Sequence, residues 1–354
     1  MNVWTATTSF RKSKRLQLLY LIINSHLEDP IRFPNFRQVR RLSFSGHFRK
    51  ADFNCLFQHP IILDNPRLRT LCLSNDHDYI PGLLSLKRPI PATIFDLQLH
   101  TFSLRSIRHV LNGHLTYLDL SRSLLAIEYT WVMLLEHLSS QNIRLRGLAL
   151  DHFVTSDDTR NLLAYLSSYS SLESFRFSSI EWYDDYDTHP VYFYTQVLPL
   201  HVETLVELEL RPIWESYWCV GVDNIYRLRQ CKRLRNLSIK VYHRGLDPDP
   251  HPGRSSVGSF YGDKNIPDQE DMNSVHLTLE SIPFCWPNLE KLALEPAASR
   301  ALARHHSYMT IGAQFHLGIQ RRIRASIESF ARRLQMGSNI CLQPANGSGD
   351  EDFG

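Results

Sequence analysis

The side chains best able to bind a metal or act as nucleophiles are 17 histidines and six cysteines. His305 and His306 are adjacent, and His243 and His251 lie on either side of a proline-containing stretch. None of these histidines lies at ligand spacing from a cysteine or a carboxylate, and no two cysteines form a Cys-x-x-Cys pair. We therefore predict no metal and no cofactor, and we expect reduced thiols in a cytoplasmic or nuclear protein.

Sequence motifs for catalysis are also absent. The chain contains no G-x-G-x-x-G, no phosphate-binding P-loop, no G-x-S-x-G and no H-E-x-x-H. We predict that the protein is not an enzyme. An enzyme with an unrecognised site is the alternative, and turnover of a tested substrate would favour it.

A cluster of carboxylates and aromatic residues occupies positions 181–187, Glu-Trp-Tyr-Asp-Asp-Tyr-Asp. One interpretation is an exposed recognition patch, because aromatic side chains often anchor protein partners. The other is a solvated loop whose aromatic rings pack on a helix over residues 192–197. The sequence leaves both open.

These residues need a scaffold, and one pattern that recurs along the chain predicts it. Leucine, two residues, leucine, one residue and leucine occur at positions 115–120, and again at 68–73, 145–150, 205–210 and 289–294. In a strand, alternate side chains point to opposite faces, so the last two leucines share one face. A lone strand cannot bury that face, whereas parallel strands stacked under connecting helices can.

Nine strands are predicted in this way, and successive middle residues are 21 to 33 residues apart except for the last interval of 55. Helical spacing of apolar residues is seen between several of them, at 104–111, 131–138, 156–166, 222–228 and 275–282. We predict an α/β fold, an irregular leucine-rich repeat solenoid of about nine repeats, with a curved parallel sheet and helices on the convex side. The middle residues of the predicted strands are Leu42, Leu71, Leu97, Leu118, Leu148, Phe175, Leu208, Leu237 and Leu292.

The rest of the chain divides by composition. Residues 1–36 are predicted to form an N-terminal capping helix, over 15–27, and a loop, and residues 37–300 the solenoid. An interruption at 244–271, rich in Pro, Gly, Asp and Ser, is predicted to be a mobile insertion. Deletion of residues 245–270 is predicted to cost little stability. Residues 301–336 are predicted to contain a C-terminal capping helix, and 337–354 a disordered tail.

Neither a membrane nor a nucleic acid is predicted as a partner. The apolar run at 16–23 is far shorter than the roughly 20 residues that span a bilayer. The net charge is only +3. The helix expected over 315–334 is basic and amphipathic, which also suits a membrane or nucleic acid. We favour a cap, because the ends of a solenoid need to be covered.

The repeats resemble the leucine-rich repeat regions of fungal F-box-type proteins. The likeness rests on lead-ins such as Pro66-Arg67-Leu68 and Pro287-Asn288-Leu289, and on apolar residues at the turn that follows five of the nine predicted strands. The segment 16–45 is similar to the helix and first strand that often follow the F-box in that family. The resemblance covers roughly residues 10–300.

In that family, F-box helices bind the adaptor of a cullin-type ubiquitin ligase, and the repeats recruit the substrate. The resemblance therefore implies a substrate-recognition protein of the ubiquitin-ligase type, but no F-box precedes the repeats in this sequence. We expect that the chain as written does not bind the adaptor directly and that ligase membership requires an F-box supplied upstream. A ligase-independent scaffold is the alternative.

Binding is expected on the concave face, toward which the residues between the inward leucines point. Its charge is concentrated in repeats four to seven, where aromatic residues at the rim add anchors. The alternative is an ordinary solvated sheet face whose charges pair with one another. The predicted partner-binding residues are Tyr117, Asp119, Arg176, Trp182, Tyr183, Glu207, Glu209, Arg211 and Trp214.

Overall fold

The computed structural model divides the chain into two compact units, Met1–Leu172 and Glu173–Gly354. Each unit contains parallel strands and helices. The residues that the structure describes are 18–23, 39–46, 60–75, 82–83, 90–100, 102–103, 111, 113–121, 130–153, 156–179, 188–213, 216–241, 246, 273–297, 308–334 and 341–342.

The first unit contains a parallel sheet in the order β1-β2-β3-β5-β7-β8. Two short strands, β4 (Gly82–Leu83) and β6 (Phe102–Ser103), pair with each other outside it. The sheet strands are β1 (Leu18–Ile23), β2 (Arg41–Gly46), β3 (Thr70–Asn75), β5 (Asp96–His100), β7 (Tyr117–Leu120) and β8 (Gly147–Phe153), and the helices are α2 (Pro60–Leu63), α3 (Thr130–Ser140) and α4 (Ser156–Leu166).

The second unit has the same organisation, with parallel strands in the order β9-β10-β11-β12-β13. One of its helical segments is a π-helix, η3 (Phe193–Val197). The strands are β9 (Ser174–Ser179), β10 (Glu207–Leu210), β11 (Asn236–Val241), β12 (Lys291–Pro296) and β13 (Cys341–Leu342), and the helices are α5 (Thr188–Tyr192), α6 (Leu198–His201), α7 (Val222–Leu228), α8 (Ser274–Cys285) and α10 (Tyr308–Leu334).

All nine strands predicted from the leucine pattern are present, and their middle residues lie side by side. In the first unit, Leu42, Leu71, Leu97, Leu118 and Leu148 are successive register partners. In the second, the register runs through Phe175, Leu208, Leu237 and Leu292. Each of these side chains is at most 2% exposed. The α/β prediction with a parallel sheet is therefore confirmed.

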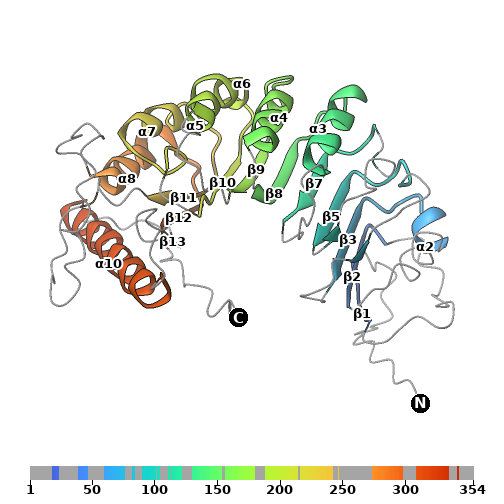
Figure 1. Ribbon diagram of the computed structural model, residues 1–354, viewed down its shortest axis with the longest axis horizontal. Coiled ribbons are helices and arrows are strands. Elements are labelled where there is room, and N and C mark those ends of the chain that lie inside the picture. The colour runs from blue at the N-terminus through green and yellow to red at the C-terminus, as the bar shows by residue number, and fades with distance from the viewer. Residues whose placement is uncertain are drawn as a thin grey trace, which may run out of the picture. The chain divides into compact units, whose positions relative to one another are not determined.

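The connecting helices cover one face of the strands. Figure 1 shows α3 and α4 on one side of β7 and β8 and, within the second unit, α5 to α8 on one side of its strands. Four of the predicted helices, those over 131–138, 156–166, 222–228 and 275–282, correspond to α3, α4, α7 and α8. Asp157 and Asp158 lie in the first turn of α4, where carboxylates favour a helix start. The helix predicted over 104–111 falls almost entirely outside the described residues.

Hydrogen bonds between buried side chains and backbone groups connect neighbouring segments of the fold. The Tyr165 hydroxyl donates to the Ile143 carbonyl at 2.9 Å and accepts from the Leu145 amide at 3.2 Å. The Trp286 indole donates to the Leu228 carbonyl at 3.1 Å, and the Asn65 amide to the Val39 carbonyl at 3.0 Å. Such bonds satisfy backbone groups that the turns would otherwise bury without partners.

The predicted N-terminal capping helix over 15–27 is wrong where the structure describes it. Residues Leu18–Ile23 form strand β1, which pairs in parallel with Arg41–Gly46. A short continuous apolar run suits a buried strand as well as a helix, so its periodicity does not decide between them. The Tyr and Ile residues of this run favour a strand, and hydrogen bonding to β2 stabilises it.

Helix α10 packs against α8 and β12 at the end of the second unit. Ile319, Ile323 and Phe330 are buried, whereas Arg321 and Arg324 are exposed. This amphipathic distribution is what a cap on the last strand requires. Within the described part of the chain, no helix combines the length and the apolar character needed to cross a bilayer.

Parts of the two stretches predicted to be mobile or disordered are ordered in the structure. Leu246 lies inside the predicted insertion 244–271, yet its side chain is only 6% exposed and its carbonyl accepts a hydrogen bond from Arg322 of α10. Cys341–Leu342 lies inside the predicted disordered tail, yet it forms β13 on the edge of β12. An apolar residue within a polar stretch can thus still be buried against a neighbouring helix. The other residues of both stretches lie outside the described ones.

Two deletions within the insertion should therefore differ in their effect on stability. Removal of 247–270 should lower the free energy of unfolding by less than about 1 kcal/mol, because loop closure depends weakly on length. Removal of 245–270 also deletes buried Leu246 and should cost about 2 kcal/mol more. Urea unfolding of both deletions and the parent chain measures the difference. Equal losses for the two deletions would contradict the structural role of Leu246.

Candidate protein-binding surface

The face opposite the helices is polar in the second unit. Its side chains, here called the second open face, are Ser174, Arg176, Glu207, Glu209, Arg211, Asn236, Ser238, Lys240, Lys291, Ala293 and Glu295. They follow from strand alternation, since β11 alternates half-exposed and buried residues along its whole length. The residues that lie between the inward leucines form one row across these strands, here called the central row. Its members Arg176, Glu209, Ser238 and Ala293 are successive register partners.

Glu209 joins two arginines on this face. Its Oε2 lies 2.8 Å from Nε of Arg176, and its Oε1 lies 2.8 Å from Nε of Arg211. Nη2 of Arg211 also lies 3.5 Å from Oε1 of Glu295. Glu209 is 18% exposed and the two arginines 44% and 48% exposed, so each pair contributes at most about 1 kcal/mol. The main consequence is geometric, since one carboxylate orients both guanidinium groups.

Glu207 lies one row away and is held by uncharged partners. Its Oε2 accepts a hydrogen bond from the Ser174 hydroxyl at 3.0 Å, and its Oε1 accepts one from the Asn236 amide at 2.7 Å. The three residues come from three neighbouring strands. Both carboxylates of β10 are therefore fixed by residues on the strands at its sides.

Lys240 and Glu295 extend the face beyond the predicted residues. They are register partners on β11 and β12. Burial lowers the pKa of Lys240, and nearby Arg211 lowers it further, while Glu295 opposes the shift. Both residues lie two positions after members of the central row, on the same face of their strands. They are not among the predicted binding residues, although strand alternation in the sequence would have indicated them.

The first unit has a corresponding polar face, here called the first open face and made of Arg41, Ser43, Thr70, Cys72, Ser74, Asp96, Gln98, His100, Tyr117, Asp119, Gly147 and Ala149. Its predicted row of Ser43, Cys72, Gln98, Asp119 and Ala149 is also in register.

Hydrogen bonds within and between strands connect the side chains of the first open face. Arg41 donates to Gln98 Oε1 at 3.4 Å, and Gln98 donates to both carboxylate oxygens of Asp96 on the same strand at 3.2 Å. Burial raises the pKa of Asp96, although its hydrogen bonds with Gln98 and Thr70 oppose the shift. Asp119 Oδ1 accepts from the amide and the hydroxyl of Ser121 at 2.9 and 2.5 Å.

His100 belongs to the same network. Its Nδ1 lies 2.9 Å from the Ser121 carbonyl oxygen. Burial alone would lower the pKa of His100, but its hydrogen bonds with Cys72 and Ser121 and the charge of Asp119 raise it above the usual value. The Cys72 thiol is only 9% exposed, which gives a large substrate little access to it. Among the described residues, no group of three His, Cys, Asp or Glu side chains is arranged to hold a metal ion.

Tyr117 lies over Gly147 on the adjacent strand. A Cβ atom at position 147 would lie 2.1 Å from Cδ1 of Tyr117, well inside contact distance. The absence of a side chain at Gly147 thus leaves the space that the Tyr117 ring occupies. The orientation of this predicted anchor depends on its neighbour.

Gly147→Ala should displace the Tyr117 ring and lower the free energy of unfolding by about 1–3 kcal/mol, the usual cost of overpacking. The loss should be much smaller when Tyr117→Ala is already present, because the colliding atoms are then gone. A double-mutant cycle by urea unfolding measures this coupling. Equal losses in both backgrounds would show that the glycine is needed for another reason.

Lys240 should give the stability a pH dependence of known sign. Below its folded-state pKa, the lysine is charged in both states and the fold bears the full desolvation cost. As pH rises from that value toward 10.5, the ordinary pKa of a lysine in an unfolded chain, the folded state loses the proton first, so stability increases. The difference in unfolding free energy between the wild type and Lys240→Met should therefore shift in favour of the wild type with rising pH.

Urea unfolding between neutral and alkaline pH tests this. Lys291→Met, at an exposed position on β12, controls for the loss of one charge. A constant or oppositely sloped difference for Lys240→Met would contradict the predicted effect of burial.

The predicted site residues fall into three groups. Arg176, Glu209 and Arg211 are in contact, and Glu207 lies on the neighbouring row. Tyr117 and Asp119 are placed on the first open face. Trp182, Tyr183 and Trp214 lie outside the described residues.

A scan against models of known protein families finds no match to this chain, and a search of curated proteins finds none either. Its function is therefore inferred from the geometry of these faces.

Proposed function

We propose that this chain is a non-enzymatic protein-binding module of the irregular leucine-rich repeat type, which holds a protein partner on its open faces. The observation that carries the proposal is the position of Arg176 and Arg211, both oriented by Glu209 on a sheet face that the helices of the second unit leave uncovered. Leucine-rich repeat solenoids present this face on their concave side.

Two properties of the second open face support a binding role. Arginine is enriched among the residues that dominate interface energies, because its planar guanidinium group forms several directed hydrogen bonds. Nearly half of each arginine side chain is exposed although its orientation is fixed, so less conformational entropy is lost on binding. The alternative is an ordinary solvated sheet face whose charges pair with one another. Binding of a partner to this face distinguishes the two interpretations.

Membership of a cullin-type ubiquitin ligase is a finer proposal that rests on the resemblance to fungal F-box-type proteins. Under this proposal, the open faces recruit a substrate, and an F-box supplied upstream binds the adaptor. Co-purification of the full-length gene product with the cullin adaptor would support ligase membership. A partner captured without the adaptor would favour the ligase-independent scaffold.

Charge-reversal variants test the open-face assignment once proximity labelling with the full chain has identified a partner. Arg176→Glu and Glu209→Arg should each weaken binding of the purified partner by about tenfold or more, measured by calorimetry. The double variant Arg176→Glu with Glu209→Arg restores the pair between positions 176 and 209 with its charges exchanged, but it loses the pair with Arg211. It should be more stable than Glu209→Arg alone but should not regain binding, because the partner meets reversed charges.

Lys232→Glu is the matched control, since Lys232 is exposed in the turn between α7 and β11 and is not part of the second open face. It should leave the affinity unchanged. Wild-type affinity in the exchanged double variant, together with loss of binding in Lys232→Glu, would show that the partner binds outside the second open face.

A further inference from the structure

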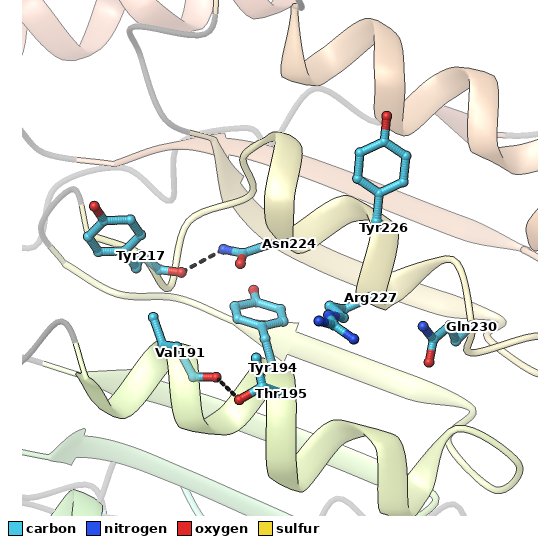
Figure 2. Close-up of a pocket in the computed structure, with 8 residues that line it drawn as sticks. All are labelled: Val191, Tyr194, Thr195, Tyr217, Asn224, Tyr226, Arg227 and Gln230. Carbon is cyan, nitrogen blue, oxygen red and sulfur yellow. Dashed lines mark hydrogen bonds between the residues drawn. The ribbon is translucent and has the colours of Figure 1, made fainter. Parts of the chain in front are cut away.

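A groove lies on the helical side of the second unit, away from the second open face. One wall is the helix formed by α5 and η3, which contributes Val191 and Tyr194. The other wall is α7, which contributes Arg227, together with the turn after it, which contributes Gln230. The loop residue Tyr217 closes one end, as Figure 2 shows. The groove has a volume of about 480 Å³, within the range of sites that bind small molecules or short peptide segments.

Internal hydrogen bonds fix the walls of this groove. The Asn224 amide donates to the carbonyls of Tyr217 and Cys219 at 2.7 and 3.0 Å, which ties the loop to α7. The Tyr194 hydroxyl donates to the Trp218 carbonyl at 3.1 Å, so the floor is tied to the same loop. The helical wall includes the π-helix η3, an uncommon conformation that is frequent at functional sites. The groove is therefore preformed.

Aromatic and apolar surface remains exposed along the groove. Tyr217, Tyr226 and Val191 are 48%, 49% and 49% exposed. The guanidinium group of Arg229 lies 5.0 Å from the centre of the Tyr226 ring and restrains it. Figure 2 shows the Tyr226 ring pointing away from Tyr194 and Val191, so Tyr217 is the aromatic side chain best placed to anchor an occupant.

The groove also offers hydrogen-bond donors and one charge. In the part of the chain that the structure describes, neither phenol hydroxyl of Tyr217 or Tyr226 has a hydrogen-bond partner, and no carboxylate forms an ion pair with Arg227. Arg227 is exposed and is the charged residue among those that line the groove. An occupant that complements this surface supplies acceptors, apolar rings and a carboxylate.

We propose that this groove binds an extended, proline-containing segment of a partner protein, with an acidic residue of that segment placed against Arg227. A polyproline II segment has no internal hydrogen bonds, so its carbonyls can accept from the Tyr217 hydroxyl and the Gln230 side-chain amide. A helix satisfies its own carbonyls and would leave these donors without acceptors. An added β-strand needs a sheet edge, whereas helices and a loop line this groove.

This site is separate from the second open face, so the two proposals can fail independently. The test uses the full chain and a series of fluorescein-labelled proline peptides of about ten residues, each with one glutamate at a different position. Fluorescence anisotropy should show saturable binding for at least one peptide. Its counterpart with lysine in place of glutamate should bind about tenfold more weakly or worse.

Three variants locate the binding. Tyr217→Ala and Arg227→Glu should each weaken the best peptide by about tenfold or more, and Arg227→Glu should now prefer the lysine peptide. Tyr192→Ala is the matched control, because Tyr192 is 44% exposed on α5 but does not line the groove. Circular dichroism verifies that each variant is folded.

Two results would overturn the proposal. One is that no glutamate peptide binds the wild type more tightly than its lysine counterpart. The other is that Tyr192→Ala weakens the best peptide as much as Tyr217→Ala does, which would move binding away from the groove.

Discussion

A backbone carbonyl that accepts two successive amides from the next strand segment sets the strand register on which the other features depend. The Arg40 carbonyl accepts the amides of both Arg69 and Thr70, at 2.8 and 3.0 Å. The same two-amide arrangement recurs at later junctions in both units, at the carbonyls of Arg69, Phe95, Thr116, Glu173, Val206 and Arg235. A slip of one residue would move every leucine from the buried to the open face. The leucine lead-in and this carbonyl therefore fix the same alignment.

That alignment separates the two faces of each sheet. Under the helices, the leucines pack together with the aromatic residues Phe175, Phe177 and Trp218. The ring centre of Phe177 lies 6.0 Å from that of Phe175 and 4.9 Å from that of Trp218. On the open faces, the same alternation places polar groups next to one another on neighbouring strands. Cross-strand neighbours of this kind pair because their side chains are only a few ångströms apart. The network around Glu209 thus results from strand register rather than from any special loop.

The strands could be predicted from the sequence because their signal is local and repeated. Leu118 and Leu208 each lie in a complete pattern, and both pair where expected. The segment 18–23 could not be assigned, because six successive apolar residues have neither a helical nor a strand period, and only pairing with β2 decides. The groove was not predictable either. Tyr217 and Arg227 belong to different elements, and no spacing in the sequence indicates that they line one cavity.

The paired charges also bear on how selective the open face can be. Glu209 is only 18% exposed and shares its two oxygens between two arginines. A partner that separated Glu209 from these arginines without replacing their hydrogen bonds would leave charged groups desolvated, at a cost of roughly 1–3 kcal/mol per unsatisfied group. A partner with matching acceptors avoids that cost and gains the contacts. Under the proposed binding role, the network would therefore contribute more to rejecting unsuitable partners than to overall affinity, as charged interface groups often do.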